Sequence, residues 1–103
     1  MRSIFKFTVP TGDHRTFVSA VPMHSGAKVL SAGCQGSDLV IWAEVLSDSP
    51  IVTRKIRVIG TGWNLDTIDG DCNHPFLGNF IGTVQFRDGT GLVFHLFDLG
   101  EEN

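Results

Sequence analysis

Short apolar runs of strand length recur along this chain, and turn-forming residues separate them. The run from 51 to 59 is the clearest, because apolar and charged side chains alternate along it as they do on a half-buried strand. Its alternating residues are Ile56 and Val58 against Lys55 and Arg57. No window carries an apolar stripe at helical spacing with caps at its ends. The pattern therefore predicts an all-β fold with little helix.

The runs predict about seven short antiparallel strands. They span Ser3 to Val9, Arg15 to Val21, Val29 to Gln35, Leu39 to Leu46, Ile51 to Ile59, Asn79 to Arg87 and Leu92 to Phe97. The connections between them predict three hairpins, which join the first strand to the second, the third to the fourth and the sixth to the seventh. Such a set of strands is typical of a β-sandwich or a small barrel.

The composition fits a single compact domain over residues 1–103. Hydrophobic residues make up 42% of the chain and charged residues 18%, so apolar burial can offset the chain entropy lost on folding. A chain this poor in charge is expected to bury part of its surface against a partner or a second copy, as a homo-oligomer. The net charge of −3 argues against nucleic-acid binding, which needs clustered lysine and arginine.

The sequence also predicts a location inside the cell. No stretch approaches the roughly 18 apolar residues of a membrane-spanning helix, and residues 1–4 contain no apolar signal core. Cys34 and Cys72 lie in different segments and form neither a CxxC motif nor a disulfide-dense pattern. Both thiols are therefore expected to be reduced.

One long irregular loop, from 62 to 78, interrupts the strand pattern. Long loops in small domains commonly carry function, and large aromatic and aliphatic side chains dominate many interfaces. The candidate partner-binding residues in this loop are Trp63, Leu65, Phe76 and Leu77.

The same loop contains groups that can bind metals. Asp66, Asp69 and Asp71 supply oxygen ligands, but their spacing does not match the EF-hand pattern. Cys72 and His74 suggest half of a zinc site, without the second ligand pair that such sites usually have. We therefore predict no metal and no other cofactor.

Four basic residues form a candidate ligand site, and they are Arg54, Lys55, Arg57 and Arg87. A strip of positive charge on a strand can hold a phosphate or an acidic surface, although a solvated sheet face explains the same residues. His95 lies within the last apolar run, where no nucleophile or carboxylate motif accompanies it. The expectation is a protein without catalytic activity, in which His95 is partly buried and bonded to backbone.

Several short motifs are spread over nearly the whole chain. They are Ile4-Phe5-Lys6-Phe7, Ile41-Trp42-Ala43, Asp48-Ser49-Pro50, Gly60-Thr61-Gly62, Phe80-Ile81-Gly82-Thr83 and His95-Leu96-Phe97. With them the chain resembles a family of small uncharacterised proteins encoded by bacteriophages and by bacterial genomes that carry prophages. It departs from that family after the glycine turn, where Trp63-Asn64-Leu65 replaces a histidine and a proline. The resemblance implies a phage setting and a compact domain, without an activity.

These observations lead to a functional hypothesis. We expect a non-enzymatic phage accessory protein that binds a host protein in the host cytoplasm, in counter-defence, and whose sheet edges can accept a partner strand. Two alternatives are a binder that sequesters a small, nucleotide-like ligand and a minor structural protein of the virion.

Overall fold

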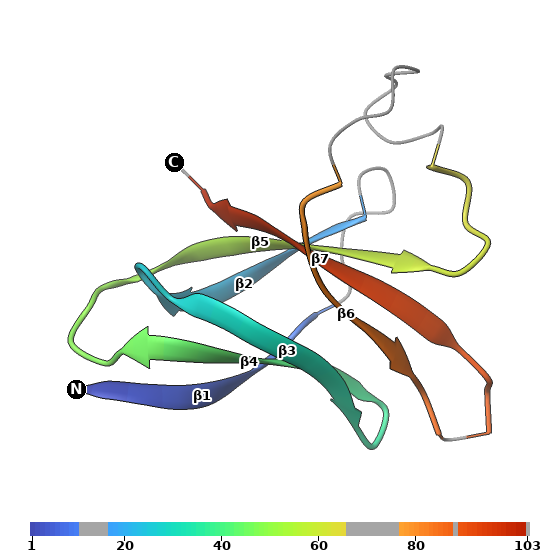
Figure 1. Ribbon diagram of the computed structural model, residues 1–103, viewed down its shortest axis with the longest axis horizontal. Coiled ribbons are helices and arrows are strands. Elements are labelled where there is room, and N and C mark those ends of the chain that lie inside the picture. Colours follow the sequence, from blue (N-terminus) through green and yellow to red (C-terminus); the bar gives the residue numbers. More distant parts are fainter. Residues whose placement is uncertain (11–16, 66–76, 88, 103) are drawn as a thin grey trace.

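The computed structural model describes residues 1–10, 17–65, 77–87 and 89–102 (Figure 1). Its strands are β1 (Arg2–Thr8), β2 (Val18–His24), β3 (Lys28–Gln35), β4 (Asp38–Leu46), β5 (Ile51–Gly60), β6 (Asn79–Gln85) and β7 (Val93–Glu101). They form two antiparallel sheets, of order β1-β4-β3 and β2-β5-β7-β6. The prediction of an all-β fold with about seven antiparallel strands is confirmed, and the described strands close no barrel.

The two sheets pack face to face around one apolar core. Side chains alternate between the faces of a strand, so every second residue of a strand points toward the other sheet. The inward residues include Ile41, Ala43 and Val45 of β4, together with Met23 of β2, Ile56 of β5 and Leu96 of β7. Because each of these side chains is almost fully buried, the sandwich is stabilised mainly by the apolar surface that its two inner faces remove from water.

Two of the three predicted hairpins are present, and the other prediction is wrong. β3 pairs with β4 and β6 pairs with β7, as expected. β1 and β2, however, lie in different sheets, since β1 pairs with β4 and β2 pairs with β5. Alternating apolar residues define which face of a strand is buried, but they do not define which strand it pairs with.

β2 begins and ends later than its sequence pattern predicted, and it includes Pro22. Proline has no backbone N–H, so it is tolerated in a sheet only where that position faces solvent. The backbone N–H of Ser25 donates to the carbonyl of Pro50, at 2.8 Å, so the odd-numbered residues of β2 bond to β5. The nitrogen of Pro22 therefore faces the outer edge of the sheet, where it breaks no hydrogen bond.

The sheets also approach each other along one side, where β3 lies beside β6. A Cβ atom added to Gly82 would lie 3.8 Å from the Cβ of Ala32, which is ordinary van der Waals contact. Cys34 Sγ lies 3.7 Å from the carbonyl oxygen of Gln85 on the same side.

The described residues contain no helix with the length and apolar character that a membrane span requires.

Candidate functional site

The side chain of Trp63 packs directly onto the end of β5. The chain turns after Gly60, and the backbone N–H of Trp63 donates to the carbonyl of Gly60 at 3.1 Å. A Cβ atom on Gly60 would overlap Cε2 of the indole. Only glycine leaves room for the ring at this position, so Gly60 fixes where Trp63 sits.

Trp63 belongs to a group of four aromatic rings, which we call the aromatic cluster: Phe17, Trp63, Phe86 and Phe94. Ring centroids are 5.1 Å apart for Phe17 and Trp63, 6.0 Å for Trp63 and Phe94, and 5.5 Å for Phe86 and Phe94. Although it contacts two other rings, Trp63 remains 46% exposed, and Leu65 is 37% exposed. A large apolar ring that is held in place and still reaches solvent is typical of an interface anchor.

Phe17 has a strained backbone at this cluster. Its φ is 60°, in the left-handed region that non-glycine residues rarely adopt. The conformation costs about 1–2 kcal/mol. It directs the carbonyl of Phe17 to the N–H of Val58, at 2.9 Å, while the ring of Phe17 contacts Trp63. Strain of this kind is concentrated at functional sites, which adds weight to the cluster as a site.

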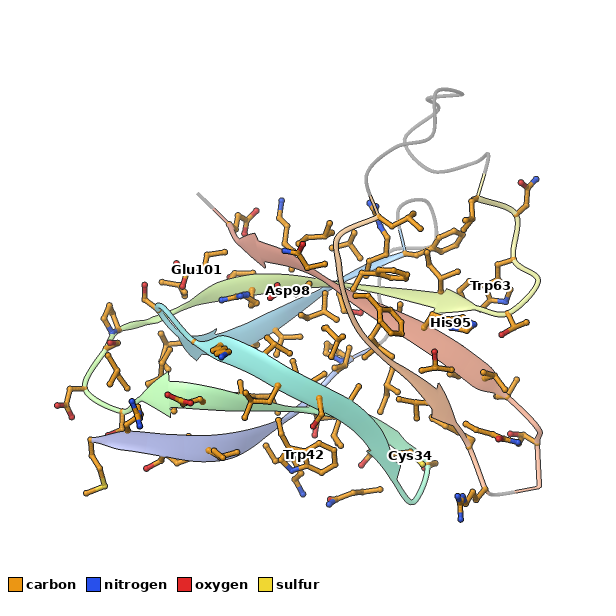
Figure 2. The ribbon with its side chains drawn as sticks, viewed as in Figure 1. Cys34, Trp42, Trp63, His95, Asp98 and Glu101 are labelled. Carbon is orange, nitrogen blue, oxygen red and sulfur yellow. The ribbon has the colours of Figure 1, made fainter. Side chains whose placement is uncertain are left out.

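His95 lies on β7 between two threonine hydroxyls, on the same side of the molecule as Trp63 (Figure 2). Its Nε2 is 2.8 Å from Thr61 Oγ1 and its Nδ1 is 3.0 Å from Thr83 Oγ1. A neutral imidazole has one donor and one acceptor nitrogen, so the two hydroxyls satisfy it with opposite roles. The partners are therefore side chains, where the sequence predicted backbone. In a catalytic triad a carboxylate would hold Nδ1; here a hydroxyl does so.

Arg54 lies at the opposite end of the sandwich, on the inward face of β5. Its guanidinium donates to both carboxylate oxygens of Asp98, from Nε at 2.9 Å and from Nη2 at 2.6 Å. Nη1 donates to the carbonyl of Ala27 at 2.9 Å. Both charged side chains are only 13% exposed. This bidentate pair is far stronger than a surface ion pair, and it engages every nitrogen of the guanidinium together with the bond to Ala27.

The turn between β2 and β3 is hydrogen-bonded to Glu101, at the end of β7. Glu101 accepts a hydrogen bond from the backbone N–H of Gly26 and one from Ser25 Oγ, at 3.3 Å. Because this turn carries the chain from one sheet to the other, these bonds and those of Arg54 hold the two sheets together at this end. β7 accordingly extends to Glu101, beyond the predicted end at Phe97.

The other basic residues lie apart from Arg54. Lys55 and Arg57 occupy the opposite face of β5, where Lys55 Nζ is 3.9 Å from Glu102 Oε1 and Arg57 is only 4% exposed. Arg87 is exposed and follows β6 at the turn into β7, which is the end of β7 farthest from Arg54. The four residues are not brought together into one site.

The ion pair between Arg54 and Asp98 makes the free energy of unfolding depend on pH in the acid range. Burial alone would raise the pKa of Asp98, but hydrogen bonds from Arg54 and from the backbone of Gly100, with the charge of Arg54, hold that pKa below its usual value. Stabilisation from a carboxyl with a lowered pKa is complete above the unfolded-state pKa, about 3.9, and is lost as the pH falls through the folded-state value. We expect the free energy of unfolding to drop below about pH 4, and to drop less steeply in Asp98→Asn, in urea titrations at a series of pH values.

Several sequence predictions fall on residues outside the described ranges. These are Phe76 of the partner-binding set and the metal-ligand candidates Asp66, Asp69, Asp71, Cys72 and His74. Leu77 is described and half-buried, and it precedes Gly78, which packs against Phe97 and Leu99 rather than near Trp63. Among the described residues, no three His, Cys, Asp or Glu side chains lie close enough to hold a metal ion together.

A family model described as "Domain of unknown function (DUF7352)" matches residues 1–103. The chain belongs to the DUF7352 family. The motifs of the sequence predicted a family of uncharacterised proteins, and this match confirms it. No curated protein and no solved structure matches this chain.

Sequence reasoning identified Trp63 but missed the residues that position it. Phe17 lies immediately before β2, and Phe94 lies on β7. The sequence pattern assigned each of them to an ordinary strand. The sequence pattern placed Gly60 in a glycine turn, but the room that it leaves for the indole depends on a contact that no local pattern encodes. The signal that was available is the glycine pair placed immediately before a tryptophan.

Proposed function

We propose that this DUF7352 domain is a non-enzymatic protein-binding module, and that its contact surface is the aromatic cluster with Leu65. The main support for this proposal is the position of the Trp63 side chain. Its ring is held on Gly60 between Phe17 and Phe94, and it is still 46% exposed. A rigid aromatic side chain loses little conformational entropy on binding, so such a ring can contribute much of an interface's affinity.

The biological setting is part of the proposal. The motifs that resemble phage and prophage proteins support a phage accessory protein that binds a host protein in the host cytoplasm, in counter-defence. The alternative of a binder for a nucleotide-like ligand receives less support, because a phosphate would have to displace Asp98 from Arg54. The burial of Arg57 also argues against a nucleotide-like ligand at these basic residues.

Trp63→Ala is expected to weaken binding of the host partner by about thirtyfold or more, the effect of losing one interface hot spot. The partner would be captured from bacterial lysate on immobilised protein and identified by quantitative mass spectrometry. Phe80→Ala is the matched control, since Phe80 is 63% exposed on β6 and lies outside the aromatic cluster. A partner retained by Trp63→Ala and lost with Phe80→Ala would refute the assignment of the surface.

A further inference from the structure

The two sheets have four edge strands, and three of them carry a feature that interferes with strand pairing. β2 contains Pro22, β3 has a bulge at Leu30, and β6 has one at Ile81. Within the described ranges, β1 alone has neither proline nor bulge, and its pairing with β4 is regular over its whole length. Figure 1 shows β1 along the lower margin of the molecule, with β4 on its inner side.

The hydrogen bonds at both ends of β1 show which backbone groups are unused by β4. The N–H of Val9 donates to the carbonyl of Leu39 at 2.8 Å, and the N–H of Ser47 donates to the carbonyl of Met1 at 2.9 Å. In an antiparallel pair, alternate residues bond to the neighbour and the others face away. The residues that direct their N–H and C=O groups toward the outer edge are therefore Arg2, Ile4, Lys6 and Thr8.

The cations of β1 lean away from this edge. Lysine on an edge strand normally deters pairing, because its charge stands where a second strand would lie. Lys6 Nζ instead donates to Gln35 Oε1 on β3, across the outer face of the sheet. Arg2 Nε lies 3.1 Å from Glu44 Oε1 on β4. Neither of these two cations therefore stands where another strand would pair with β1.

We propose that β1 pairs with β1 of a second copy of this chain, antiparallel about a two-fold axis at Phe5. Bonded pairs must join even-numbered residues of the two copies. An axis at Ile4 would set Arg2 opposite Lys6, and an axis at Lys6 would set two lysines opposite each other; like charges in opposite positions destabilise a sheet. The axis at Phe5 sets Ile4 opposite Lys6 and Arg2 opposite Thr8, and it uses the full strand.

Side chains on both faces of β1 fit this register. Phe5 is 40% exposed beside His24, with ring centroids 5.7 Å apart, and it meets its own copy at a position where opposite side chains lie closest. Ile4, 63% exposed, lies opposite Lys6 of the other copy, where no like charge meets that lysine. The product is one six-stranded sheet of order β3-β4-β1-β1-β4-β3. One strand edge buries less than the roughly 800 Å² per partner of a standard interface, so we expect a dissociation constant on the order of micromolar.

Sedimentation velocity over a concentration series tests the dimer, and two substitutions at Ile4 test its register. Ile4→Lys sets lysine opposite Lys6 of the other copy and should weaken the dimer by about tenfold; Ile4→Glu creates two interchain ion pairs and should tighten it. Within one chain Ile4 lies opposite Glu44 of β4. A lysine at position 4 can pair with Glu44, so Ile4→Lys should leave the folded monomer at least as stable, whereas Ile4→Glu sets two carboxylates opposite each other and should make the monomer less stable. A dimer that dissociates while thermal stability is retained therefore cannot result from unfolding.

Leu30→Lys is the matched control, because Leu30 is an exposed leucine on the edge strand β3. It should leave the dimer unchanged, and so should Trp63→Ala, which keeps this test separate from that of the partner-binding surface. A monomer at every concentration would overturn the proposal. So would a dimer that resists Ile4→Lys, or one that both Ile4 variants weaken equally.

Discussion

Replacing Arg54 by methionine will lower the free energy of unfolding by about 3–5 kcal/mol. The substitution preserves much of the side-chain volume but leaves the carboxylate of Asp98, only 13% exposed, without its bidentate partner. It also removes the donor to the carbonyl of Ala27, which holds the crossover between the sheets. In a domain of this length the loss corresponds to roughly 15–30 °C in melting temperature. Urea and thermal unfolding followed by circular dichroism measure both quantities.

The neighbouring lysine provides the control. Lys55→Met removes a charge from the same strand, but Lys55 is half-exposed and its ion pair with Glu102 is long, so we expect a change of less than about 1 kcal/mol. The double variant Arg54→Met, Asp98→Leu should regain much of the lost stability, because no unpaired charge remains buried. Equal effects of Arg54→Met and Lys55→Met would contradict the view that the Arg54–Asp98 pair holds this end of the sandwich.

Gly60→Ala will displace the indole of Trp63 and abolish the binding surface. The new methyl group would overlap the indole ring, so the ring cannot remain where it is. We expect a cost of about 1–3 kcal/mol in stability, the usual result of forcing a methyl group into filled space, and a loss of partner binding as large as that of Trp63→Ala. Unfolding titrations and affinity capture measure the two effects, and the change in Trp63 fluorescence reports the movement of the ring.

Gly82→Ala is the matched substitution. Gly82 is also a strand glycine, but its added Cβ would make only ordinary contacts, 3.8 Å from Ala32. Stability and partner binding should both remain close to those of the parent chain. If Gly60→Ala bound the partner as well as Gly82→Ala does, the position of Trp63 on β5 would be irrelevant to binding.

Local patterns predicted the strands of this domain and part of their pairing. The runs around Ile56 and Val84 alternate clearly, and the short turns between β3 and β4 and between β6 and β7 restrict those strands to hairpins. The pairing of β1 with β4 was not predictable in this way. It joins Phe5 to Ala43 across a long stretch of sequence, and neither strand carries a local signal for the other.

The site was predictable only where one residue stood out by itself. Trp63 did so, because a large ring in an irregular segment has no regular core position. Arg54 was assigned with Lys55 and Arg57 to one basic strip, although alternation already separates it from both by face. What neutralises Arg54 is Asp98, 44 positions along the chain, at the point where β7 was expected to have ended. Contacts at that separation depend on how the sheets pack, which composition and periodicity do not specify.

Site-specific photo-crosslinking can show whether a host protein contacts this domain at the surface around Trp63. A photoreactive phenylalanine analogue would replace Leu65, which is 37% exposed and follows Trp63 by two residues, and in a second protein it would replace Phe80 on β6. Both proteins would be irradiated inside bacterial cells, and their covalent adducts identified by mass spectrometry. We expect one discrete host-protein adduct from position 65 that is absent from position 80. An adduct from position 80 alone, or the same host proteins at equal yield from both positions, would contradict it.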